Sequence, residues 1–431
     1  MSQTEIGLIG IVILIVLLMM GVHVGFCLII VGFAGYAIIG GLDAAISNMA
    51  ILPFDKLNNY HFAVLPLFLL MSAFVSQSGI GKEAYEAARA WLGQFKGGLA
   101  MATVGGCGLF AACAGTSLAG SVVMGKIAYP EMKRLGYSDL LTAPTISAGG
   151  TLGILIPPSM GFVLIGILAE LSIGKLFIAG IIPGITEIIF YLVTIFLLCK
   201  IHPSYAPSGV KTTWQEKAWA LRLTWPVILL FCLIMGGIYF GIFTPTEAGG
   251  IGAFGALILS LAKRQLSLKG FWLALMDTGK MTAMIIIMLV GAYTFNAFLA
   301  ITQIPFTLSE FIVDLPVPTY IILAALLIFY IICGMFFDII AILILTIPVI
   351  YPTVDALGFN LIWYSVLMVR IIEIGMITPP FGINLFGLAG IINVPLGTLY
   401  RGIFPFVIAD VLNITLLASF PILSTLLPSL M

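Results

Sequence analysis

Apolar positions in this chain occur in long blocks that are separated by short polar stretches. Several blocks reach the roughly 20 residues that a helix needs to cross a bilayer. They predict five transmembrane helices in each half of the chain. The predicted spans lie near 5–20, 25–41, 61–80, 140–170 and 177–199 in the first half, and near 224–241, 246–262, 280–302, 362–392 and 403–424 in the second.

Between the third and fourth spans of each half lies an apolar segment that is interrupted near its centre. The first covers about 98–125 and is interrupted at Gly115-Thr116-Ser117. The second covers about 320–347 and is interrupted between Gly334 and Asp338. Two pieces of about a dozen residues are each too short to cross a bilayer. Such segments are typical of re-entrant helical hairpins, which enter and leave the membrane on one face.

Composition agrees with this pattern. Of 431 residues, 61% are hydrophobic and 8% are charged, whereas soluble proteins carry about 25% charged residues. The chain is therefore predicted to be an all-α polytopic membrane protein in contact with lipid. Its net charge of zero gives no general attraction for nucleic acid. The six cysteines and three histidines show no metal-ligand spacing, so no transition-metal site is expected.

The two halves of the chain repeat each other. Tyr129-Pro130 recurs as Tyr351-Pro352, 222 positions later. A glycine followed by a Pro-Pro pair occurs in both halves at the same offset, as Gly153 with Pro157-Pro158 and as Gly375 with Pro379-Pro380. An internal repeat in so apolar a chain is typical of secondary transporters.

Loop charge orients the repeats, because cytoplasmic loops are enriched in Lys and Arg. The loops around the second hairpin contain no basic residue. Those around the first contain Lys82, Arg89, Lys96, Lys126, Lys133 and Arg134. An odd number of spans per half would also invert the second repeat. We therefore expect inverted repeats at 1–200 and 223–431, a cytoplasmic linker at 201–222 that includes Lys211, and both termini on the outer face.

The fourth span of each half is predicted to be broken. Ser147 to Thr151 and then Pro157-Pro158 interrupt the first, and Gly375 to Pro380 interrupts the second. Proline removes amide donors and frees carbonyls. Carbonyls and hydroxyls suit Na⁺, whereas helix N-termini suit a carboxylate. The predicted Na⁺-binding residues are Gly115, Thr116, Ser117, Gly149, Thr151, Gly334, Asp338, Gly375 and Thr378. The predicted substrate-binding residues are Ser117, Ser159, Asp338 and Asn384.

Other charged residues occur within the apolar blocks. Asp338 is a functional candidate because an ionisable group in a membrane is costly; a helix cap is the alternative. Arg370 and Glu373 share one helix face at a spacing of three and predict a structural ion pair, although Glu373 could instead touch the ion site. Glu187, Glu247 and Asp410 lie in outer spans, and we expect them to hold helices together or to face a partner subunit.

The chain resembles the large membrane subunit of TRAP (tripartite ATP-independent periplasmic) transporters. Gly105 to Pro158 and Ile377 to Gly387 carry the resemblance, and it gives Ser117 and Asp338 a binding role. It implies import of an organic acid such as a C4-dicarboxylate or sialic acid across the bacterial inner membrane. It further implies two or more Na⁺ coupling ions, an elevator motion, a small four-helix (Q-type) membrane subunit and a periplasmic (P-type) substrate-binding protein.

Two alternatives remain open from the residues. The first is a Na⁺-coupled symporter for di- or tricarboxylates that has the same architecture and works alone. The second is an intramembrane aspartyl protease, which needs two facing carboxylates. Asp338 and Asp410 are the only plausible pair. Since no motif surrounds Asp410 and an enzyme would not require the repeat, we expect that the protein is not an enzyme.

Overall fold

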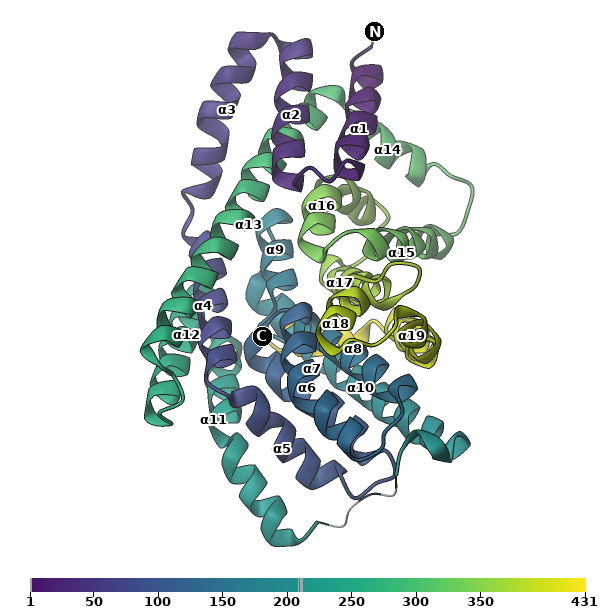
Figure 1. Ribbon diagram of the computed structural model, residues 1–431. Coiled ribbons are helices and arrows are strands. Elements are labelled where there is room, and N and C mark those ends of the chain that lie inside the picture. Colours follow the sequence, from purple (N-terminus) through teal and green to yellow (C-terminus); the bar gives the residue numbers. More distant parts are fainter. Residues whose placement is uncertain (1, 208, 210–211) are drawn as a thin grey trace.

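The computed structural model describes residues 2–207, 209 and 212–431, and these residues form helices without any strand (Figure 1). The α-helices are α1 (Gln3–Met19), α2 (Val24–Gly40), α3 (Leu42–Leu57), α4 (Val64–Gln77), α5 (Ile80–Leu92), α6 (Gly98–Ala114), α7 (Ser117–Arg134), α8 (Asp139–Leu155), α9 (Met160–Leu168), α10 (Ile173–Ile201), α11 (Trp214–Tyr239), α12 (Pro245–Ala262), α13 (Leu268–Thr302), α14 (Ile304–Val313), α15 (Thr319–Phe336), α16 (Ile339–Ala356), α17 (Leu361–Ile377), α18 (Ile383–Ile392), α19 (Leu396–Ser419) and α20 (Ile422–Ser429). Two 3-10 helices, η1 (Tyr60–Ala63) and η2 (Pro203–Tyr205), complete the order.

Nine helical segments of the described chain are long and apolar enough to cross a membrane. The helices α1 and α2, with 17 residues each, are apolar but shorter than those nine. This confirms a polytopic, all-helical membrane protein.

The interrupted segments form two helix pairs, and their arms are longer than predicted. The pair α6 and α7 is interrupted at Gly115 and Thr116, and the pair α15 and α16 at Phe337 and Asp338. The arms contain 17 or 18 residues each, so the prediction of about a dozen was wrong. Each arm is roughly 26 Å long at 1.5 Å per residue. Hydropathy detects only the apolar part of a helix. It therefore underestimates the length of α7, which continues as a helix to its basic end at Arg134.

The helix breaks at the Pro-Pro pairs are confirmed. The chain leaves the helix between α8 and α9 at Pro157-Pro158, and between α17 and α18 at Pro379-Pro380; both Pro-Pro bonds are cis. The predicted interruption from Ser147 to Thr151 is wrong, because α8 is continuous there. The glycines of that stretch instead allow close packing: a Cβ at Gly149 would lie 2.9 Å from the sulfur of Cys107 in α6.

Helices also occur where the sequence predicted loops. Helices α3 and α5 connect the early spans, and α14 and α20 are short additional helices. Helix α11 begins at Trp214, so residues 214–222 of the predicted linker are helical. Thr213 and Glu216 form a capping box there, which satisfies amide groups at the helix start. Lys211, which supported the cytoplasmic position of the linker, lies outside the described residues.

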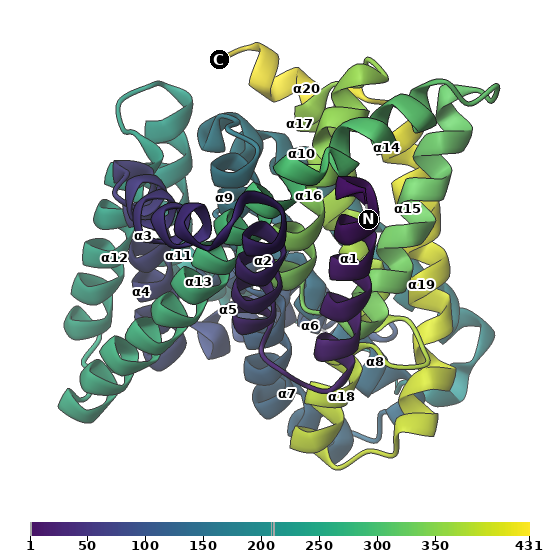
Figure 2. The same cartoon turned by 90° about the horizontal axis from the view of Figure 1, so that it is seen from above.

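The helices are arranged in two groups that lie side by side in both views (Figures 1 and 2). In one group, α2 packs along α13 and α4 along α12. In the other, α8 packs against α7, α6 and α19, and α15 packs against α17. The second group contains both broken helices and both interrupted pairs, so every predicted site residue lies in it.

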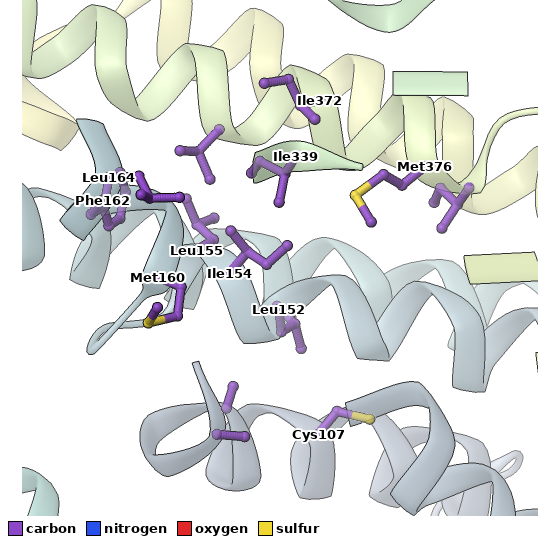
Figure 3. Close-up of a cluster of buried hydrophobic side chains, with 14 of the residues drawn as sticks. Cys107, Leu152, Ile154, Leu155, Met160, Phe162, Leu164, Ile339, Ile372 and Met376 are labelled. Carbon is purple, nitrogen blue, oxygen red and sulfur yellow. The ribbon is translucent and has the colours of Figure 1, made fainter. Parts of the chain in front are cut away.

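An apolar core joins the two halves of the sequence inside this second group. Figure 3 shows Ile339 of α16 between Ile372 of α17 and Ile154 of α8. Leu155 and Ile372 are fully buried, and Ile154 and Ile339 are 3% and 5% exposed. The start of α16 is therefore held against α9 and α17 by hydrophobic packing.

Candidate functional site

The first interruption lies directly against the first helix break. The carbonyl of Gly115 accepts a hydrogen bond from the amide of Met160, the first residue of α9, at 3.3 Å. On the other side, a Cβ at Gly153 in α8 would lie 2.4 Å from the carbonyl oxygen of Thr116. The backbone of α8 is in direct contact with the backbone of the interruption. Any residue other than glycine at position 153 would force the two segments apart.

The second interruption has the same relationship to the second broken helix. A Cβ at Gly375 in α17 would lie 2.6 Å from the carbonyl oxygen of Ile331, and one at Gly334 would lie 2.6 Å from that of Ile372. Gly375 follows Gly153 by the repeat offset of 222 positions. Equivalent glycines thus bring a broken helix against an interrupted pair in each half.

Polar side chains from both halves meet at the first interruption. The amide nitrogen of Asn384 in α18 donates a hydrogen bond to the hydroxyl of Ser117, at 2.5 Å. Ser117 is 1% exposed and Asn384 is fully buried. The Oδ1 atom of Asn384 has no hydrogen-bond partner within the described chain. Thr116 is the N-cap residue of α7, but its side chain makes no capping hydrogen bond, so its hydroxyl can serve a ligand.

The side chains at the second interruption and at the helix breaks hold helix ends. Asp338 is exposed and caps α16, accepting a hydrogen bond from the amide of Ile340 at 3.1 Å. The predicted alternative role as a cap is therefore present. Ser159 caps α9 through the amide of Phe162 at 3.4 Å. The Thr378 hydroxyl donates to the carbonyl of Ile374. Each of these three side chains therefore keeps at least one oxygen lone pair that could bind a ligand.

Thr151 faces a different set of residues. Its hydroxyl lies 2.6 Å from the carbonyl oxygen of Ala148 in its own helix and 3.2 Å from the carboxylate of Glu187 in α10. The phenol of Tyr191 lies 3.3 Å away. The structure therefore joins Thr151 to a polar cluster on α10 through its side chain.

That cluster is built around Arg370. Its guanidinium contacts Asp410 of α19 at 2.5 Å, Glu187 at 3.0 Å and Glu373 at 3.5 Å, and all four side chains are fully buried. The predicted pair with Glu373 is confirmed, and Glu187 and Asp410 do hold helices together. Sequence spacing could not reveal these two contacts because each partner lies on another helix. Glu247 does not hold helices together: it is exposed and caps its own helix with Thr244, and its expected contact with a partner subunit stays a prediction.

Comparison with known families decides the identity. Residues 11–423 match the family described as "Tripartite ATP-independent periplasmic transporter, DctM component". The chain belongs to this family. As a DctM component it is a transporter permease and not an enzyme, and the protease alternative is thereby excluded.

Individual relatives agree. The chain is 33% identical over 386 residues to the C4-dicarboxylate TRAP transporter large permease protein DctM of Pseudomonas aeruginosa, covering 89% of this chain and 90% of the relative. It is 30% identical to the isethionate TRAP transporter permease protein DctMQ of Oleidesulfovibrio alaskensis, covering 94% of this chain and 63% of the relative. The crystal structure of the Alcanivorax borkumensis YdaH transporter has a similar fold, with a TM-score of 0.63 at 14% identity over 89% of both chains.

Proposed function

We propose that this DctM component imports an organic acid across the bacterial inner membrane, coupled to Na⁺. The observation that carries the proposal is the pairing of each broken helix with an interrupted helix pair, in which Ser117 and Asn384 join the two halves. Irregular backbone inside a membrane is tolerated where it is buried in protein or lines a polar cavity. Two such places in one protein provide carbonyls, hydroxyls and helix termini at matching positions.

The first Na⁺ site is assigned to Gly115, Thr116 and Ser117. The support is the unused hydroxyl of Thr116 and the chain break beside it, since Na⁺ prefers oxygen ligands that include backbone carbonyls. Gly149 and Thr151 lie within α8, and the Thr151 hydroxyl is already engaged with its own helix. We therefore propose that these two residues support the site indirectly, by holding α8 close to its neighbouring helices.

The second Na⁺ site is assigned to Gly334, Asp338, Gly375 and Thr378. Asp338 is the one carboxylate among them, and its Oδ2 atom is used by the amide of Ile340. Its other oxygen can bind a cation, which would also offset the charge of the side chain. Together, the first and second sites would bind the coupling ions, and we propose two or more Na⁺ ions per transport cycle.

The substrate is assigned to the region between the helix breaks, where Ser117, Ser159, Asp338 and Asn384 supply polar groups. Ser159 and Asn384 lie at the starts of α9 and α18. Helix N-termini attract anions through the helix dipole and free amides. The C4-dicarboxylate and isethionate of the relatives' names are both small organic anions. Asp338 would contribute to anion binding through its bound Na⁺.

The halves of the chain are proposed to be inverted repeats. The group that contains both interrupted helix pairs and both broken helices is proposed to move as an elevator past the group that contains α4, α12 and α13. Support comes from reciprocal packing: α18 of the second half packs on α7 of the first, and α9 of the first half packs on α16 of the second. The distribution of Lys and Arg among the loops supports a periplasmic position for both termini.

Two partners complete the proposed transporter: a small Q-type membrane subunit and a P-type periplasmic binding protein. Support for the first comes from the relative named DctMQ, of which this chain covers 63%. The test is uptake of radiolabelled organic acids into proteoliposomes under an inward Na⁺ gradient, with and without each partner. Uptake should require both partners. Full uptake by this chain alone would contradict the proposal and favour the symporter that works without partners.

A further inference from the structure

A groove of about 530 Å³ lies between α5, α6, α10 and α11, and its walls are apolar. Thr224 of α11 is the one lining residue of the described chain that has a hydroxyl group. That hydroxyl donates to carbonyls of its own helix, at 3.2 Å to Leu221 and 3.4 Å to Ala220. No charged side chain among the described residues lines the groove. An organic acid would therefore lose its hydration there without gaining a partner.

The groove opens onto a surface that faces lipid. Ile185 of α10 and Ile228 of α11 line it and are 53% and 40% exposed. Both residues belong to helices that are long and apolar enough to cross a membrane. An ordinary lipid-facing helix contacts acyl chains from one side only, whereas four helices flank this groove. An acyl chain that enters it gains contacts with several helices at once.

Small residues create the space inside the groove. Ala88 of α5 lines it together with Gly105, Gly108 and Ala112 of α6. Side chains this small leave volume between the helices that the protein itself does not fill, although protein interiors are normally close-packed. Pro157, at the first helix break, also lines the groove. The groove therefore extends from the lipid-facing surface to the backbone beside that break.

A basic side chain lies at one end of the groove. Four residues of α11 line the groove at spacings of three and four positions: Leu221, Thr224, Ile228 and Phe231. They share one helix face, and Lys217 lies on that face four residues before Leu221. The 14 positions from Lys217 to Phe231 (231 − 217) extend roughly 21 Å at 1.5 Å per residue. This length is about half the 40–45 Å thickness of a bilayer with its headgroups, so it matches one leaflet.

Two tryptophans surround the ammonium group of Lys217. The Nζ atom lies 5.2 Å from the ring centre of Trp214 and 5.8 Å from that of Trp91, which itself lines the groove. Tryptophan is enriched where a membrane meets water. This end of the groove therefore fits the level of the lipid headgroups, next to the linker that the sequence predicts to be cytoplasmic.

The ammonium group of Lys217 can bind an anion. It donates to the neutral Oε1 atom of Gln94 at 3.2 Å, and no acidic side chain of the described ranges pairs with it. The adjacent carboxylate of Glu216 accepts from the amide of Thr213 at 2.7 Å and so serves as part of the helix cap. Since an ammonium group has three donors, Lys217 retains donors for a ligand.

We propose that the groove binds a phospholipid with an anionic headgroup. The phosphate contacts Lys217 beside Trp91, and one acyl chain follows the groove along α11 to Pro157. Anionic lipids are typical of the cytoplasmic leaflet, where they attract Lys and Arg near the membrane surface. Helix α11 packs on α12 of one group of helices, whereas α6 belongs to the other group. The lipid thus fills part of the boundary between the two groups, and its binding does not depend on the proposed Na⁺ coupling.

Native mass spectrometry of the purified full chain tests the headgroup contact with two probes, phosphatidylglycerol and phosphatidylcholine that carry the same acyl chains. The wild type should bind its first phosphatidylglycerol about fivefold more tightly, which is the equivalent of about 1 kcal/mol for one lysine. Lys217→Gln should remove this preference, and Lys217→Arg should keep it. Lys269→Gln, at an exposed position in α13, is the matched control and should bind like the wild type. Equal affinity of the wild type for both lipids, or a preference that survives in Lys217→Gln, would overturn the proposal.

A variant that fills the groove tests the path of the acyl chain. The larger side chain of Ile228→Trp takes up space in the groove, so this variant should bind both lipids more weakly. Leu233→Trp is the control, because it introduces the same side chain at an exposed position of α11 that does not line the groove. It should bind both lipids like the wild type. Unchanged lipid binding by folded Ile228→Trp protein would contradict the assigned path.

A measurement on the wild type remains decisive even if Ile228→Trp fails to fold. Electron cryo-microscopy of the wild-type protein, with any subunits that accompany it, in nanodiscs that contain phosphatidylglycerol should show the density of an acyl chain between Lys217 and Pro157. An empty groove would overturn the proposal. A helix of a partner subunit in the groove would also overturn it, because the groove would then be a protein interface.

Discussion

The side-chain amide of Asn384 donates a hydrogen bond to the hydroxyl of Ser117, which precedes it by 267 positions. The bond joins the start of α18, after the second helix break, to the start of α7, after the first interruption. Both side chains are buried, and Asn384 retains an unpartnered oxygen. The proposed binding region is thus assembled from both halves of the chain.

Loss of either partner should impair transport. In Ser117→Ala or Asn384→Ala, the remaining buried polar group loses its hydrogen bond, at a cost of about 1–3 kcal/mol. We expect uptake efficiency, measured as kcat/KM in proteoliposomes, to fall roughly tenfold or more, since 1.4 kcal/mol corresponds to a factor of ten.

The double variant sharpens this prediction. Because the two side chains act as a unit, its effect should be smaller than the sum of the single effects. Thr415→Ala on the exposed side of α19 is the control and should transport normally. If both single variants transported with the kcat/KM of the wild type, the assignment of Ser117 and Asn384 to the site would be wrong.

Residue types alone predicted where the helices break. Proline pairs and glycine between apolar blocks identified the breaks at Pro157-Pro158 and Pro379-Pro380, because proline cannot donate the helix hydrogen bond. The sequence predicts both Ser117 and Asn384 as site residues, but it does not predict their contact. It depends on how α18 packs on α7, and no local pattern encodes that packing.

Two kinds of feature were missed or misplaced. The sequence predicts a cytoplasmic loop where the structure has helix α5, because the charged residues of this helix lower its hydropathy below that of a membrane span. The sequence also predicts a break from Ser147 to Thr151, whereas the glycines of this stretch serve close helix packing in α8. The partners of Arg370 on α10 and α19 could not be predicted, because only Glu373 lies within one helical turn of it.

The charge of Asp338 can be tested apart from its role as a helix cap. Asparagine and serine are also good N-cap residues, so Asp338→Asn and Asp338→Ser should keep α16 intact. If the carboxylate binds a coupling ion, both variants should raise the Na⁺ concentration for half-maximal uptake by roughly tenfold or more, as expected for about 1.4 kcal/mol. Thermal stability measured alongside should stay close to wild type. An unchanged Na⁺ dependence would contradict the second site.

The glycine contacts between broken helices and interruptions should not tolerate a side chain. A Cβ at Gly153 or Gly375 would lie 2.4 Å or 2.6 Å from a backbone carbonyl oxygen. Gly153→Ala and Gly375→Ala should therefore each reduce stability by about 1–3 kcal/mol and strongly reduce uptake. Thermal unfolding of the purified protein and uptake measure both effects.

Gly390 in α18 is the matched control for these two glycines. A Cβ there would meet nothing within 4 Å, and alanine within a helix is more favourable than glycine by about 0.5–1 kcal/mol. Gly390→Ala should leave stability equal or slightly higher. If Gly153→Ala and Gly375→Ala behaved like Gly390→Ala, the close approach at the breaks would not matter.

The inversion of the repeats predicts opposite accessibility at equivalent positions. Arg134 and Ala356 are exposed at the ends of α7 and α16, and they differ by the repeat offset of 222 positions. In a background with Cys232 and Cys333 replaced, Arg134→Cys should react with a membrane-impermeant maleimide only from the cytoplasmic side. Ala356→Cys should react only from the periplasmic side. Labelling of both from one side would contradict the inverted arrangement.

Substrate accumulation in proteoliposomes that contain the complete transporter tests the central claim most directly. The proposed Na⁺ sites predict uphill uptake of an organic acid under an inward Na⁺ gradient. They predict none when K⁺ replaces Na⁺, even with an inward proton gradient, and much weaker accumulation with Asp338→Asn. Uphill uptake that is driven by the proton gradient in the absence of Na⁺ would contradict the account.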